Sequence, residues 1–140
     1  MRKVVFLLSI LFVSYSCKNE KKEAESPTQM ERVMAIHDEV MPKMGTLAKY
    51  TAELKAKVDT TEMGKEYEIA MKELQNANKS MMDWMMGFGN RFDSDEILNG
   101  KELSEQKKEW LDEEEIKVNQ LKEEINTSLK KAESLLEKSQ

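Results

Sequence analysis

The segment MGKEYEIAMKELQNANKSMMDW, residues 63–84, repeats its larger or apolar side chains at alternating intervals of four and three residues. The repeating positions are Met63, Tyr67, Ala70, Leu74, Ala77, Met81 and Trp84. In an α-helix this spacing puts the repeated side chains on one face, as in the seam of a coiled coil. The segment therefore predicts an amphipathic helix that buries this face against other helices.

Sequence signals on both sides set the expected limits of this helix at about residues 60–87. Asp59 and Glu62 have the spacing of a capping box, so the helix is expected to begin near Thr60. The stretch GFGNRFDSDEILNG, residues 87–100, is rich in glycine and acidic residues. It predicts that the helix ends there and that a loop follows, with a short helical turn closed by Asn99 and Gly100.

Two further helices are expected, one on each side. Ser26, Pro27 and Gln29 predict the start of a helix over about residues 27–57, kinked at Pro42. Its predicted seam is Met30, Met34, His37, Met41, Met44, Ala48 and Thr51.

Ser104 is expected to cap the last helix, over about residues 104–138. Its predicted seam is Leu111, Glu114, Val118, Leu121, Ile125, Ser128, Ala132 and Leu135. Short links between helices of similar length predict an all-α domain over residues 26–140, an antiparallel three-helix bundle.

The first seventeen residues have the order of a secretory signal. Arg2 and Lys3 precede the apolar run VVFLLSILFV, residues 4–13, and the only cysteine of the chain follows at position 17. The sequence SYSC resembles a bacterial lipobox. That resemblance implies a signal peptide over residues 1–16, a lipid-modified Cys17 and a flexible tether over residues 17–25. The alternative is an ordinary signal peptide with an incidental cysteine.

The chain is acidic, with a formal net charge of −5. Nucleic-acid binding needs a basic surface, so we expect no nucleic-acid partner. The expected partners are the membrane, through the N-terminal lipid, and another protein or a second copy of the chain. The expected location is the cell envelope, at the outer membrane.

Eleven methionines in 140 residues invite three interpretations. The first is packing, because methionine fills irregular gaps in helical cores. The second is a soft-metal site, because thioether and imidazole groups suit Cu(I). The candidate ligands are His37, Met34, Met41, Met44, Met81 and Met85. The third is a docking surface, because exposed methionines form adaptable apolar contacts, and its candidate residues are Met82, Met86 and Phe88.

Two polar residues, His37 and Glu114, fall on predicted seams at about the same level of the bundle. A buried carboxylate must be paired or neutralised. We therefore expect His37 and Glu114 to form a buried polar pair, directly or through water. A shift in register between the helices would instead bring in Asp38, Glu39 or Glu115. The chain has one histidine and no nucleophile elbow or phosphate-binding loop, so we do not expect an enzyme.

The segments VMAIHDEVMPKMG and YEIAMKELQNANKSMMDWM, followed by a long acidic helix, lie behind the lipobox-like signal. Together they resemble a family of small Bacteroidota-type lipoproteins that are often labelled "viral A-type inclusion protein". The resemblance implies a helical fold and an envelope location. It supplies no catalytic residues. The function expected from the sequence is a lipid-anchored helical module that acts by binding, and the alternative is Cu(I) binding by the methionine and histidine cluster.

Overall fold

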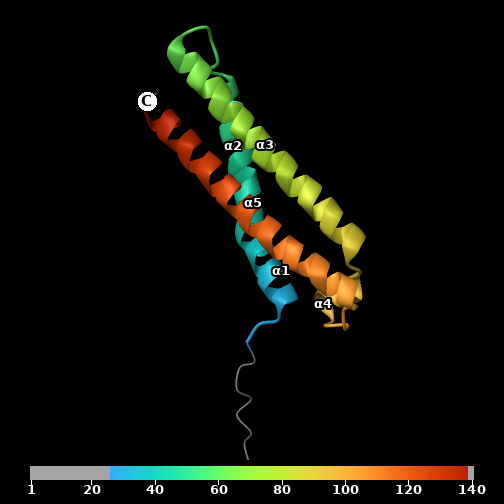
Figure 1. Ribbon diagram of the computed structural model, residues 1–140. Coiled ribbons are helices and arrows are strands. Elements are labelled where there is room, and N and C mark those ends of the chain that lie inside the picture. Colours follow the sequence, from blue (N-terminus) through green and yellow to red (C-terminus); the bar gives the residue numbers. More distant parts are fainter. Residues whose placement is uncertain (1–25, 139–140) are drawn as a thin grey trace, which may run out of the picture.

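The computed structural model describes residues 26–138, and their regular structure is entirely helical (Figure 1). The elements are α1 (Gln29–Val40), the 3-10 turn η1 (Met41–Lys43), α2 (Met44–Lys55), α3 (Glu62–Arg91), α4 (Ser94–Leu98) and α5 (Glu105–Glu137). Helix α3 packs against α2 and α5, and α1 lies along α5. The all-α class is confirmed. The expected signal peptide, the Cys17 lipid and the tether lie outside the described residues.

None of the helices between residues 26 and 138 combines the length and the apolar character needed to cross a membrane. Along these residues the chain runs up through α1 and α2, down through α3 and up again through α5 (Figure 1). Helix α4 lies at the end of the molecule where α1 begins, α3 ends and α5 begins.

The first helix begins at a different cap from the expected one. Thr28 is the N-cap, and its Oγ1 accepts a hydrogen bond from the backbone N–H of Glu31 at 3.2 Å. Glu31 Oε2 in turn accepts from the Thr28 backbone N–H at 2.6 Å. The prediction of Ser26 as cap, with Gln29 completing the box, is wrong. A carboxylate is favoured over an amide at a helix N-terminus, where the backbone dipole is positive, and this favours Glu31.

Pro42 interrupts the first helix as expected from its chemistry. It has no backbone N–H and cannot continue the α-helical hydrogen-bond ladder. The chain passes through η1 at this point and resumes a regular helix in α2. The single helix expected over residues 27–57 is therefore two helices joined by a tight turn.

Helix α3 begins and ends later than predicted. Thr61 is the N-cap, and its hydroxyl accepts from the Gly64 backbone N–H at 3.0 Å. At the other end the helix continues through Gly87 and Gly89 to Arg91. The buried Phe88 lies in this added turn, with its ring 4.8 Å from that of Phe92. Burial of an aromatic side chain outweighs the roughly 1 kcal/mol cost of each glycine in a helix.

The loop after α3 follows the sequence expectation closely. Asp93 caps α4 in a capping box with Glu96, and Gly100 adopts a φ of 68° just after the turn. A positive φ favours glycine because it has no Cβ atom. Ser104 caps α5, which confirms its predicted role.

The core is built from one face of each long helix, and two of the three predicted faces are right. In α3 the predicted seam is buried except for Met63, and in α5 every predicted seam residue is buried. In α1 and α2 the only buried residue of the predicted seam is Met30, and the other buried residues are Val33, Val40, Leu47 and Leu54. These four residues recur every seven positions and fill the core, while Met34, His37, Met41 and Met44 lie half-buried at its flank.

Candidate functional site around Trp84

The indole of Trp84 lies between two hollows on opposite sides of α3. Its side chain is 8% exposed, and its ring centroid is 4.9 Å from that of Phe88 and 5.7 Å from that of His37. One hollow is a groove between α3 and α5, and the other is a cavity between α1, α3 and α4. Trp84 lines both, so it connects the two candidate sites.

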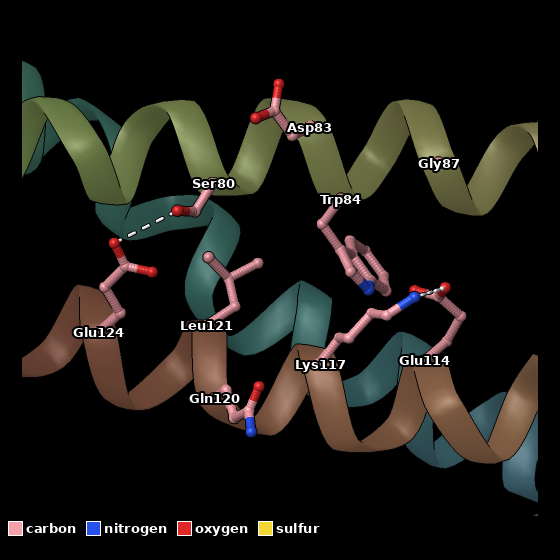
Figure 2. Close-up of a pocket in the computed structure, with 9 residues that line it drawn as sticks. All are labelled: Ser80, Asp83, Trp84, Gly87, Glu114, Lys117, Gln120, Leu121 and Glu124. Atoms are coloured by element: carbon pink, nitrogen blue, oxygen red, sulfur yellow. Dashed lines mark hydrogen bonds and ion pairs between the residues drawn. The ribbon is translucent and has the colours of Figure 1, made fainter.

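The α3/α5 groove has a volume of about 400 Å³ (Figure 2). It is lined by Ser80, Asp83, Trp84, Gly87, Glu114, Lys117, Gln120, Leu121 and Glu124. Ser80 Oγ donates to Glu124 Oε1 at 3.2 Å across one end of the groove. A Cβ atom added at Gly87 would have no atom within 4 Å, so this glycine leaves open space above the groove.

The indole nitrogen of Trp84 is buried and has no hydrogen-bond partner among the described residues. Figure 2 shows the indole pointing from α3 toward α5, with its nitrogen on the side of Lys117 and Glu114. Buried polar groups in proteins are almost always paired, and an unpaired one costs about 1–3 kcal/mol. The nitrogen itself has almost no exposed surface, so an acceptor atom of a ligand reaches it only if a neighbouring side chain moves.

Glu114 is buried beside this groove, with an exposed fraction of 2%. Its Oε1 accepts from Arg91 Nη1 at 2.9 Å and from Lys117 Nζ at 2.9 Å. Arg91 also bonds Glu113 at 2.6 Å, and this hydrogen bond lowers the pKa of the Glu113 carboxyl. The buried carboxylate is thus neutralised by two cations.

No direct contact joins His37 to Glu114, and the alternative carboxylate, Asp38, lies beside His37 instead. His37 Nδ1 lies 2.9 Å from Asp38 Oδ1, and Glu114 contacts Arg91 and Lys117 instead. The prediction placed Arg91 in a loop and so missed the cation that reaches Glu114. Its position seven residues after Trp84, on the same stripe of a continuous helix, is the signal that identifies it.

The second hollow brings together three of the six candidate metal ligands. Met34, His37 and Met85 line a cavity of about 170 Å³, together with Trp84, Phe88, Gly89 and Ile97. Met41 and Met44 are half-buried on the flank of the first two helices and do not line this cavity. Met81 is fully buried in the core, so it packs against neighbouring helices.

The expected docking surface of Met82, Met86 and Phe88 is only partly present. Met82 is 55% exposed and Met86 is 66% exposed on the outer side of α3. Phe88 is 4% exposed because it lies between the rings of Trp84 and Phe92. Phe88 therefore belongs to the core, and Met85, at 38%, is the exposed neighbour of the other two methionines.

A second buried ion pair, which the sequence analysis missed, joins α4 to α5. Glu96 is 6% exposed, and its two carboxylate oxygens lie 2.8 and 2.6 Å from Lys107 Nζ. This hydrogen bond, together with one from the Asp93 backbone N–H, lowers the pKa of the Glu96 carboxyl. The pair fixes α4 against the start of α5, beside the Trp84 end of the molecule.

Comparisons with known proteins found no matching family model, no matching curated protein and no matching solved structure. Between residues 26 and 138 there is also no group of three or more histidine, cysteine, aspartate or glutamate side chains that could hold a metal ion.

Proposed function

We propose that this protein is a lipid-anchored cell-envelope protein, built as an antiparallel three-helix bundle, that binds a polypeptide partner and does not catalyse a reaction. The observation that carries the proposal is the buried, unpaired indole nitrogen of Trp84 beside the α3/α5 groove. A peptide carbonyl oxygen is an acceptor that can satisfy this donor once a side chain that covers the nitrogen moves aside. Buried donors of this kind gain most from a ligand that excludes water.

The groove favours a basic segment of the partner. Asp83 and Glu124 contribute carboxylates to its walls, and Leu121 contributes an apolar surface. The chain as a whole carries a formal charge of −5, which favours the approach of a basic partner. A segment that presents one carbonyl oxygen to Trp84 and a lysine or arginine to the carboxylates fits this arrangement.

Binding is favoured over catalysis because the carboxylates of the groove are already engaged in ion pairs or hydrogen bonds. Glu114 pairs with Arg91 and Lys117, Asp83 pairs with Lys79, and Glu124 accepts from Ser80. A general acid or base needs a group that is free to exchange a proton with a substrate. These pairs instead hold fixed charges at fixed positions, which is what recognition requires.

The N-terminal sequence supports the envelope location and the anchor. A lipid on Cys17 would be joined to residue 26 by a segment with a reach of at most about 36 Å. Residue 26 precedes α1, whose first residue, Gln29, donates to Asp112 of α5 at 2.7 Å. The anchor would therefore hold the Trp84 end of the molecule close to the membrane, where a membrane-associated partner can reach the groove.

Site-specific photo-cross-linking in living cells of the native host tests the proposal. A photoreactive amino acid at Gln120, in the groove wall, is expected to give one discrete adduct with a partner protein. The same amino acid at Lys130, an exposed α5 position that does not line the groove, is expected to give no such adduct. Equal labelling at both positions, or an adduct formed only from Met86, would contradict recognition by the groove.

A further inference from the structure

A separate site is present on the other side of Trp84. Met34 and His37 lie one turn apart on α1, and Met85 approaches from α3 to line the same cavity. We infer that Met34, His37 and Met85 form a binding site for a soft monovalent metal ion, namely Cu(I). This inference does not rest on the proposed function, because it uses a different cavity.

The histidine is held in an orientation that leaves one ring nitrogen available. Its Nδ1 contacts Asp38 Oδ1 at 2.9 Å, and its ring stacks on Trp84. A carboxylate on one imidazole nitrogen is a common way to orient a histidine that binds a metal through the other nitrogen. The His37 side chain is 15% exposed, so its position is fixed by packing as well.

The donor set selects the class of metal. Thioether sulfur and neutral imidazole suit Cu(I), whereas magnesium and calcium require oxygen ligands. The other side chains that line the cavity are Trp84, Phe88 and Ile97, so no carboxylate is among its lining residues. This apolar lining favours an ion of low charge that is bound by soft, neutral ligands.

The partial exposure of the three proposed ligands makes the site accessible to an ion from solvent. Met85 is 38% exposed, while Met34 and His37 are half-buried. Met85 can therefore move over the cavity without any change in the core, since methionine has several rotatable bonds. The site differs from the one predicted from spacing because Met41, Met44 and Met81 take no part in it.

A metal titration of the full-length chain in detergent tests the inference. Cys17 is replaced by serine in every sample, so that its thiol cannot bind the metal. Ag(I), a redox-inert ion with the same ligand preference, and Cu(I) under anaerobic reducing conditions are each titrated against a competing chelator. We expect one ion per chain, with partial quenching of the tryptophan fluorescence, because Trp84 lines the cavity and Trp110 does not.

Three variants and two controls identify the ligands. Three variants each remove one proposed ligand: Met34→Leu, His37→Gln and Met85→Leu. Each is expected to weaken metal affinity by at least about tenfold. A loss of about this size follows when a residue that only hydrogen-bonds a metal ligand is removed, and loss of the ligand itself should not be smaller. Met44→Leu and Met86→Leu are expected to leave the affinity unchanged. Leucine conserves most of the methionine volume, so the fold is expected to tolerate these changes.

Two results would overturn the inference. One is the absence of saturable binding at micromolar Ag(I) and Cu(I). The other is an equal loss of affinity in the ligand variants and in the control variants, which would indicate unspecific thioether binding. The methyl resonances of the methionines give a check on the unsubstituted ligands: those of Met34 and Met85 must shift with Ag(I), and those of Met44 and Met86 must not.

Discussion

Four methionines around Trp84 show how strongly position decides the role of one residue type. Met81 is fully buried, and Met85 lines the cavity that holds His37. Met82 and Met86 project from the outer side of α3. The helical period accounts for this division, because positions four residues apart share a stripe and adjacent positions do not.

Alanine substitutions at adjacent methionines give a direct test of that division. Met81→Ala is expected to lower the free energy of unfolding by about 2–5 kcal/mol, because it removes buried contacts and leaves a cavity. Met82→Ala is expected to change it by less than about 0.5 kcal/mol. Urea denaturation of the two variants measures the difference. Similar losses would mean that α3 presents a different face to the core.

The pairing of His37 shows what spacing along a helix cannot predict. The spacing identifies Glu114 as a buried position of its own helix, and the structure confirms this burial. The spacing does not fix how one helix is rotated relative to the next, and this rotation decides which side chain pairs with Glu114. Arg91 takes that place because α3 extends one turn further than its glycines suggest.

Two glycines of α3 have opposite roles. A Cβ atom at Gly64 would lie 1.9 Å from Asp59 Oδ1 and 2.6 Å from the Asp59 backbone, so this glycine permits the close approach of the preceding turn. A Cβ atom at Gly87 would meet open space. Only the first glycine is required by the fold.

Alanine at each glycine is expected to change stability in opposite directions. Gly87→Ala should raise the free energy of unfolding by about 0.5–1 kcal/mol, because it removes the entropic cost of glycine in a helix. Gly64→Ala should lower it, because the turn at Asp59 must move. Thermal unfolding followed by circular dichroism measures both. A loss of stability in Gly87→Ala would show that the groove side of α3 is more crowded than the structure indicates.

The contact between α4 and α5 has a predictable pH dependence. Lys107 holds the pKa of the Glu96 carboxyl below its ordinary value of 4.5. Because the pKa is lower in the folded state, the contribution of Glu96 to stability is present above pH about 4.5 and is lost as the pH falls through the folded-state pKa.

Melting temperatures at about pH 6 and about pH 3 check this sign. The wild-type chain is expected to lose more stability between these values than Glu96→Gln, in which the titrating group is absent. Lys107→Gln is expected to reduce the loss in the same way, because it removes the cation that lowers the pKa. An identical loss in all three proteins would show that the ion pair contributes nothing to acid unfolding.

The elements differ in how far their sequence predicts them. The faces of α3 and α5 follow from a regular heptad spacing. The Ser104 cap of α5 is also predicted correctly, whereas α3 is capped by Thr61 and not by the expected Asp59. The first helix is harder because two stripes, one of methionine and one of valine and leucine, compete for the core. Burial favours the branched side chains, which pack with less loss of rotamer freedom than methionine.

The two candidate sites arise from packing between helices. The α3/α5 groove and the Met34, His37 and Met85 cavity each combine residues from different elements. Sequence patterns identified most of the methionines and Trp84 as a group. They could not identify the unpaired indole nitrogen, because its lack of a partner depends on whether the neighbouring helix places a hydrogen-bond acceptor beside it.

The position of the Trp84 end relative to the membrane follows from the proposed lipid anchor. Cys17→Ser should move the protein from the membrane fraction to the soluble fraction of the envelope, and metabolic labelling with a fatty acid should be lost. Ser16→Ala, which changes the neighbouring position and keeps the thiol, serves as the control. Membrane association of the serine variant would contradict lipid anchoring through Cys17.

Binding of the proposed partner in the α3/α5 groove is tested most directly by blocking the groove without disturbing the fold. Gly87→Gln places a side chain over the groove, and Gly45→Gln makes the same change in α2, where a new Cβ atom also meets no atom within 4 Å. Each is combined with the photoreactive residue at Gln120, and the yield of the partner adduct is measured. We predict that Gly87→Gln abolishes the adduct and that Gly45→Gln preserves it. An undiminished adduct in Gly87→Gln would contradict binding in the groove.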